Sequence, residues 1–205
     1  MKKILMTIII FTVFINSCNS KTNTTIKEGD IIFHESTSSQ ADELRYSTGS
    51  KYTHMGIIYL IDKKFYVYEA VQPVKFTSLE KWINHGKNKH YVIKRLKNAD
   101  ELLMPDNIKR MKEIGKIYYG KDYDNLFQWN DSRIYCSELV WKIYKNSLNI
   151  EIGKLQKFKD FDLTHPKVKA LIKKRYGNSI NLNETIISPI QMFNSELLVK
   201  VKEEN

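Results

Sequence analysis

The sequence predicts an α+β domain in which helices flank a mainly antiparallel sheet. The chain has 205 residues, enough for one domain with a substantial core, and 42% of them are hydrophobic and 12% aromatic. Runs with strand character gather in the first half of the chain, and helical periodicities surround and follow them. Strands that succeed one another in this way favour pairing with their neighbours into an antiparallel sheet.

Five short β-rich runs are the predicted strands of this sheet. They cover residues 31–34, 55–61, 65–71, 91–96 and 197–201. A polar turn of Asp62, Lys63 and Lys64 separates the second run from the third, so we expect these two strands to form a hairpin. Gly29 and Asp30 mark the turn that precedes the first strand.

Helical patterns fill most of the remaining chain. The predicted helices cover residues 36–48, 77–85, 100–117, 136–148, 167–176 and a short segment after 188–189. The helix at 136–148 has the strongest pattern, because Leu139, Val140 and Ile143 recur at three- and four-residue spacing. Pro105 is expected to break or start the helix at 100–117.

The first residues have the pattern of a secretory signal peptide, with two lysines before a 12-residue apolar run at 4–15. This run is shorter than the about 20 residues of a membrane-spanning helix. The segment from Ile15 to Cys18 resembles a bacterial lipobox, in which the cysteine carries lipid. The sequence therefore predicts a lipoprotein signal peptide at 1–17, a tether at 18–27 and a folded domain at 28–205. Export without lipidation and an uncleaved anchor helix are the alternatives.

The formal net charge is +10, from 33 basic and 23 acidic residues. The lysines are scattered, as at Lys167, Lys169 and Lys173, and they form no stripe of the kind that a nucleic-acid groove needs. We therefore expect no nucleic-acid partner. The basic residues either form a solvated face or attract the protein to an anionic membrane surface. A lipid at Cys18 would reinforce that attraction. The predicted location is the bacterial cell envelope, on a membrane that the sequence does not specify.

Three residues suit thiol chemistry. Cys136 begins a predicted helix, where backbone N–H groups favour the thiolate and can stabilise an oxyanion. His54 precedes a strand and could take the thiol proton, while Glu69 on the partner strand of the hairpin could hold its second ring nitrogen. Each residue also has a structural reading: Cys136 as a core residue, His54 as a structural histidine and Glu69 as a surface acid.

Six motifs occur in order along residues 29–148. They are Gly29-Asp30-Ile31-Ile32-Phe33, Ser38-Ser39-Gln40, Ser50-Lys51-Tyr52-Thr53-His54-Met55-Gly56-Ile57, Tyr68-Glu69-Ala70, Gly120-Lys121-Asp122-Tyr123-Asp124 and Tyr135-Cys136-Ser137-Glu138-Leu139-Val140. Together they resemble the YiiX/YaeF-like permuted papain-like amidases, relatives of the NlpC-type cell-wall peptidases. In that family the histidine-bearing strands precede the cysteine-bearing helix, as His54 precedes Cys136 here.

The resemblance implies a circularly permuted papain-like fold. It also implies that Cys136 is the nucleophile, His54 the general base and Glu69 the third, polar member of the site. The implied reaction is hydrolysis of an amide, or a related ester or thioester, through an acyl-enzyme, with no metal and no cofactor. By analogy with papain-like enzymes, Gln40 is a candidate for the oxyanion hole or else a helix-surface residue. Tyr135 borders the substrate cleft or simply packs.

Three functions remain open at this stage. The first is a hydrolase acting on a peptidoglycan stem peptide, another peptide-like amide or a lipid-derived acyl group. The second is an acyltransferase that uses the same acyl-enzyme, and the third is a non-catalytic binding module of the cell envelope. The presence of all three candidate residues argues against the third. The sequence does not reveal the oligomeric state.

Overall fold

The computed structural model describes residues 25–38 and 40–204. Their main feature is a six-stranded sheet in the order β4-β3-β2-β1-β5-β8, and every neighbouring pair in it is antiparallel. Its strands are β1 (Ile31–His34), β2 (His54–Ile61), β3 (Lys64–Glu69), β4 (Lys75–Ser78), β5 (Tyr91–Leu96) and β8 (Leu198–Glu204). The predicted α+β class and the predicted hairpin of β2 and β3 are confirmed.

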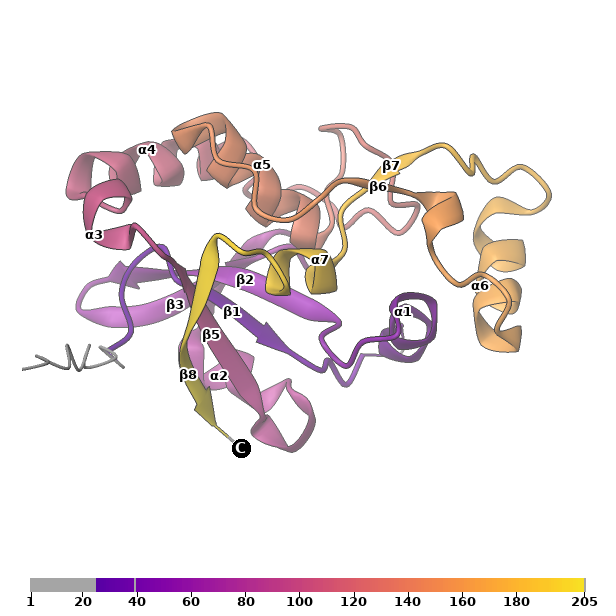
Figure 1. Ribbon diagram of the computed structural model, residues 1–205, viewed down its shortest axis with the longest axis horizontal. Coiled ribbons are helices and arrows are strands. Elements are labelled where there is room, and N and C mark those ends of the chain that lie inside the picture. The colour runs from indigo at the N-terminus through magenta and orange to yellow at the C-terminus, as the bar shows by residue number, and fades with distance from the viewer. Residues whose placement is uncertain (1–24, 39, 205) are drawn as a thin grey trace, which may run out of the picture.

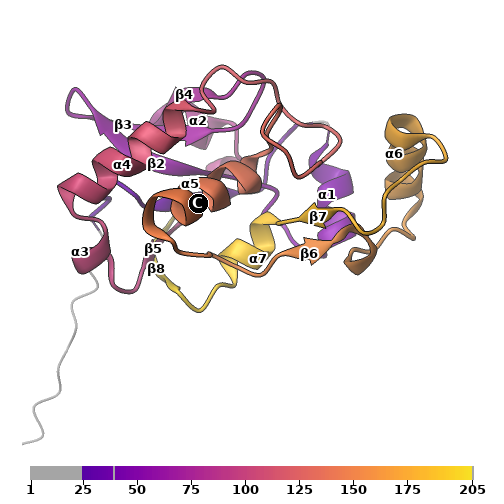
Figure 2. The ribbon, with the colours of Figure 1, turned by 90° about the horizontal axis from the view of Figure 1, so that it is seen from above.

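Helices cover both faces of the sheet (Figure 1). The longer helices α4 (Pro105–Lys116) and α5 (Cys136–Leu148) lie across one face, and α2 (Leu79–Asn84) lies on the other. Figure 2 shows α1 (Ala41–Thr48) and α6 (Pro166–Tyr176) together at one end of the molecule, beyond the ends of the strands.

Short elements complete the described chain. They are α3 (Ala99–Leu102), α7 (Pro189–Phe193), the 3-10 turns Lys87–Lys89 and Phe158–Asp160, and a two-stranded sheet of β6 (Gln156–Lys157) and β7 (Thr185–Ile186).

The sheet separates two hydrophobic clusters. Side chains alternate across a strand, so Ile31 and Phe33 of β1 join the large core beneath α5, whereas Ile32 joins a smaller cluster with Trp82 of α2. All three isoleucine and phenylalanine side chains of β1 are fully buried. Because both faces of the central strands are covered, these strands form continuous apolar runs.

The predicted boundaries were wrong in two places. The segment 77–85 was predicted as one helix, but residues 75–78 form the strand β4 and the helix begins at Leu79. The backbone at Thr77 is extended because it pairs with Val67 of β3. The helix predicted at 36–48 begins only at Ala41, because Ser36 pairs with Gly86 in an antiparallel bridge and the Thr37 N–H is bonded to the His85 carbonyl at 3.3 Å. The expected break at Pro105 is confirmed, and it separates α3 from α4.

The predicted signal peptide, the lipidation site Cys18 and most of the predicted tether fall within residues 1–24, outside the described residues. Within the described part of the chain, no helix is both long enough and apolar enough to cross a membrane.

Candidate active site

The β2–β3 hairpin brings His54 to Glu69. The register pairs Ile57 with Tyr68, so His54 at the start of β2 and Glu69 at the end of β3 meet at the open end of the hairpin. Nε2 of His54 lies 2.6 Å from Oε2 of Glu69. The Thr77 hydroxyl of β4 donates to the other carboxylate oxygen at 2.5 Å. Glu69 is only 2% exposed, and both its oxygens are hydrogen-bonded.

The electrostatics of this pair favour the charged forms. Burial alone lowers the pKa of His54, but hydrogen bonds and opposite charge from Cys136 and Glu69 outweigh it and raise that pKa to about 10. Burial alone raises the pKa of Glu69, but its bonds to His54 and Thr77 hold it below its usual value. The pair is therefore an imidazolium and a carboxylate at neutral pH.

The two pKa shifts determine how His54 and Glu69 contribute to the stability of the fold at different pH values. The pKa of His54 is higher in the folded protein than its usual 6.5, so the folded state binds the proton more tightly than the unfolded state does. The His54 contribution to stability is fully present below about pH 6.5 and is lost as the pH rises through about 10, whereas the contribution of Glu69, whose pKa is lowered, is lost as the pH falls through that pKa.

Cys136 reaches the same place from the other side of the cleft. It is the first residue of α5, its thiol is free and the residue is 3% exposed. Its sulfur lies close enough to the His54 ring to raise the pKa of that ring. Because Nε2 of His54 is bonded to Glu69, Nδ1 is the nitrogen that faces the thiol. The structure thus brings together the three residues that the sequence singled out.

Tyr123 is a site residue that the sequence analysis missed. Its hydroxyl lies near Cys136, and burial, followed by the nearby charge of Cys136, raises the pKa of Tyr123 well above the usual value. Tyr123 therefore keeps its proton and can donate it in a hydrogen bond. The Gln72 side chain positions this loop, since it accepts the Tyr123 N–H at 2.8 Å and donates to Asp122. The one available signal was its place inside the Gly120–Asp124 motif.

The two secondary candidates lie at the edge of the site. Gln40 donates to Asn125 at 3.0 Å and accepts from Arg175 at 2.6 Å. One N–H of its amide is thus directed to Asn125, and its role in an oxyanion hole stays a prediction. Tyr135 precedes Cys136, is 2% exposed and packs edge-on against Phe127 with ring centroids 5.1 Å apart.

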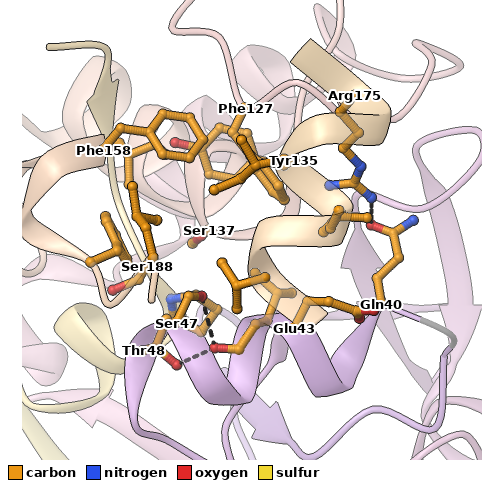
Figure 3. Close-up of a pocket in the computed structure, with 18 of the residues that line it drawn as sticks. Gln40, Glu43, Ser47, Thr48, Phe127, Tyr135, Ser137, Phe158, Arg175 and Ser188 are labelled. Carbon is orange, nitrogen blue, oxygen red and sulfur yellow. Dashed lines mark hydrogen bonds between the residues drawn. The ribbon is translucent and has the colours of Figure 1, made fainter. Parts of the chain in front are cut away.

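Two hollows meet at this site. A polar cleft of about 540 Å³ is lined by His54, Glu69 and Gln72. A smaller cavity of about 70 Å³ is lined by Cys136 and Tyr135 and is shown in Figure 3. Gln40, Leu44 and Tyr123 line both hollows and form the boundary between them. The candidate base and the candidate nucleophile therefore face different environments.

His34 is a further titratable group that lies beside His54. Its ring stacks on Trp82 with centroids 3.8 Å apart and lies 5.4 Å from the ring of His54, its partner in the β1–β2 register. Burial, and then the charge of His54, lowers the pKa of His34 to about 2, so it is neutral. Neither ring nitrogen of His34 has a hydrogen-bond partner among the described residues.

The chain matches known proteins along most of its length. Residues 25–202 match a family described as permuted papain-like amidase enzyme, YaeF/YiiX, C92 family. An uncharacterised protein YiiX of Escherichia coli (strain K12) is 44% identical over 176 residues, which cover 86% of this chain and 86% of that protein. A crystal structure described as metalloprotein yiiX from Escherichia coli O157:H7 superposes with a TM-score of 0.83 at 44% identity, and the match covers 87% of this chain and 97% of that one.

Replacing the carboxylate tests the electrostatic account of the pair. In Glu69→Gln the pKa of His54, followed by NMR titration of its ring protons, should fall from about 10 toward its usual value, because the opposite charge at 2.6 Å is removed. Thr77→Val is the matched control; it removes a bond to the same carboxylate but keeps the charge, and should lower the His54 pKa less. An unchanged His54 pKa in Glu69→Gln would contradict this account.

Proposed function

This chain belongs to the YaeF/YiiX family of permuted papain-like amidases and is a cysteine amidase-like hydrolase; on that premise we propose that Cys136 is its nucleophile, His54 its general acid and base, and Glu69 the group that orients His54. The observation that carries this proposal is the place of His54 between the Cys136 sulfur, which raises the pKa of the ring, and the Glu69 carboxylate, which is hydrogen-bonded to Nε2 at 2.6 Å. The substrate would be an amide, or a related ester or thioester.

In the proposed acylation step His54 has taken the Cys136 proton and is an imidazolium, the form that its pKa of about 10 favours at neutral pH. The Cys136 sulfur attacks the substrate carbonyl carbon, and the C–S bond forms as the carbonyl electron pair moves onto oxygen. The oxyanion then re-forms the carbonyl and the C–N bond breaks. His54 gives the Nδ1 proton to the departing amine, and Glu69 keeps the ring in the orientation for this transfer.

Deacylation reverses the roles of the same groups. Neutral His54 takes a proton from a water molecule that attacks the thioester carbonyl. The C–S bond breaks, the acid product leaves, and the thiolate and imidazolium are restored. An amine or alcohol in place of water would give acyl transfer.

Two kinds of donor could stabilise the oxyanion. The first N–H groups of an α-helix have no partner within the helix, and those of α5 begin at Cys136. The Tyr123 hydroxyl, which lies near the sulfur, is a second donor that does not ionise near neutral pH. Gln40 remains a candidate through its second amide N–H.

One solved relative is described as a metalloprotein, and that description belongs to the relative. Across residues 25–38 and 40–204 of this chain, no group of three or more His, Cys, Asp and Glu side chains is arranged to hold a metal ion. His34 has two unpartnered nitrogens, but its neighbour His54 is already bonded to Glu69 and lies beside the Cys136 sulfur. These residues do not fit such a group, and the mechanism proposed here has no step through one.

We further propose that the enzyme is exported and acts in the bacterial cell envelope, held to a membrane by lipid on Cys18. The support is the amino-terminal pattern of two lysines, an apolar run and a lipobox-like segment. The substrate would then be a cell-envelope amide or acyl compound.

The nucleophile is tested by removing its sulfur. Cys136→Ala should lower hydrolysis of a small acyl amide by at least about a thousandfold, because no other group can form the acyl-enzyme. Ser147→Ala, which removes one buried atom from the same helix away from the site, should keep its activity. Rates should be compared at equal folded fraction, monitored by circular dichroism. Full activity in Cys136→Ala would refute the proposed mechanism.

The lipid anchor is tested by labelling cells with a palmitate analogue. Cys18→Ser should abolish incorporation into this protein and release it from the membrane fraction, because the acceptor thiol is gone. Cys136→Ser serves as the control and should be labelled like the wild type. Undiminished labelling of Cys18→Ser would exclude the proposed lipidation site.

A further inference from the structure

The loop that joins α4 to α5 carries Tyr123 near its start and ends directly before Cys136; it is drawn in salmon in Figure 2. The two ends of the loop are paired, because Tyr123 and Ile134 form a parallel bridge and the Asp124 N–H is bonded to the Ile134 carbonyl at 3.1 Å. This pairing closes the loop on itself. The loop must in turn be held against α5 for Tyr123 to stay beside the Cys136 sulfur.

Lys142 is a buried cation that joins this loop to α5. It lies on the same helix as Cys136 and is only 8% exposed. Its Nζ atom donates to Oδ1 of Asp131 at 2.8 Å and to the carbonyl of Asn130 at 3.1 Å. The same Nζ atom forms an ion pair with Oε1 of Glu138 at 2.8 Å. An ammonium group has three hydrogens to donate, so these three acceptors match its full capacity.

The Glu138 end of this connection lies in the first turn of α5. Glu138 is fully buried, and its Oε2 atom accepts the N–H of Tyr135, the residue before Cys136, at 3.4 Å. Burial raises the pKa of Glu138 to about 8, and the bond to Lys142 opposes that shift. A carboxyl group keeps an acceptor oxygen in both of its protonation states. The contact with the ammonium group of Lys142 therefore does not depend on the charge of Glu138.

The other end of the connection reaches the segment of Tyr123. The side chain of Asp131 binds Lys142, and its backbone carbonyl accepts a hydrogen bond from the Nζ atom of Lys121. Lys121 lies close to Tyr123 in the chain, and its own carbonyl accepts the Val74 N–H at 2.9 Å. A continuous set of polar contacts thus runs from the first turn of α5 through Lys142 and Asp131 to the segment that carries Tyr123.

We propose that Lys142 is a positioning residue, which holds the Tyr123 hydroxyl beside the Cys136 sulfur by fixing the loop against α5. This inference rests on the proposed function, in which Cys136 is the nucleophile. Lys142 lines neither of the two hollows at the site, so it acts through the loop and not on the substrate. A displacement of about 1 Å can slow an enzyme about a hundredfold, so a contact outside the site can control the rate.

A second lysine of α5 provides a matched control. Lys145 forms an ion pair with Glu151 at 2.7 Å, and 33% and 55% of these two side chains are exposed. Exposed pairs of this kind contribute little, because solvent screens the charges. Lys142 differs in that its ammonium group is buried and joins two segments of the chain. Lys145→Met therefore removes a lysine ion pair from the same helix without changing the contacts of the loop.

The kinetic test is a double-mutant cycle with Tyr123. Lys142→Met should lower kcat for a small acyl amide by about tenfold and change KM by less than about twofold, because a group is displaced while substrate binding is kept. In a Tyr123→Phe background the same change should cost much less, since the hydroxyl that Lys142 positions is already gone. Lys145→Met should leave kcat unchanged.

Fluorine NMR gives a readout that does not depend on hydrolysis. Fluorotyrosine would be incorporated into the full chain, and the signal that disappears in Tyr123→Phe would be assigned to Tyr123. Alkylation of Cys136 by iodoacetamide should shift this signal in the wild type, because the hydroxyl lies near the sulfur. In Lys142→Met the signal should already be displaced before alkylation. Asp131→Ala, at a side chain that is 66% exposed, breaks the same connection and should displace it in the same direction.

Folding of each variant would be checked by circular dichroism. An unchanged Tyr123 signal in folded Lys142→Met would overturn the inference, and so would kcat losses that are additive with Tyr123→Phe. If Lys142→Met does not fold, the signal in Asp131→Ala decides in the same way. A displaced Tyr123 signal in a chain whose wild type hydrolyses no amide supports the positioning role and contradicts the proposed function. Cys136-dependent hydrolysis with an unchanged signal does the reverse.

Discussion

The carboxylate of Glu69 is nearly inaccessible to solvent, and a buried charge of this kind costs several kcal/mol unless a charged partner and hydrogen bonds compensate for it. His54 supplies the partner at 2.6 Å, and Thr77 of β4 supplies the second hydrogen bond. Three adjacent strands of the sheet must therefore be in register before the imidazole is held and charged. The chemistry assigned to Cys136 depends on that imidazole. The reactivity of the thiol therefore depends on the register of these strands.

The helices divide the space around this pair. α5 brings Cys136 to the His54 ring, and the loop that carries Tyr123 separates a polar cleft from an apolar cavity. In an acyl-transfer reaction the acyl group stays on sulfur while the leaving group takes its proton from the histidine. In this molecule the nucleophile and the base of such a reaction lie at the boundary of two hollows of unlike polarity.

Local patterns predicted much of this arrangement. The β2–β3 hairpin follows from two β-rich runs around a polar turn, and α5 from its apolar spacing, so the positions of His54, Glu69 and Cys136 were accessible from the sequence. Features that depend on distant segments were not. Tyr123 lies in a loop without periodicity that is held by the Gln72 side chain. β4 was mistaken for part of a helix because its strand character comes from pairing with β3.

The claim that His54 holds Cys136 in a reactive form can be tested by the rate at which iodoacetamide alkylates Cys136, resolved from Cys18 by peptide mass mapping. At about pH 6 a free thiol, with a pKa of about 8.5, is almost entirely protonated and reacts slowly. The account predicts fast labelling of the wild type at this pH and slow labelling of His54→Ala, in which the imidazolium is missing. Slow wild-type labelling that follows an ordinary thiol titration, or equal rates in the two proteins, would contradict it.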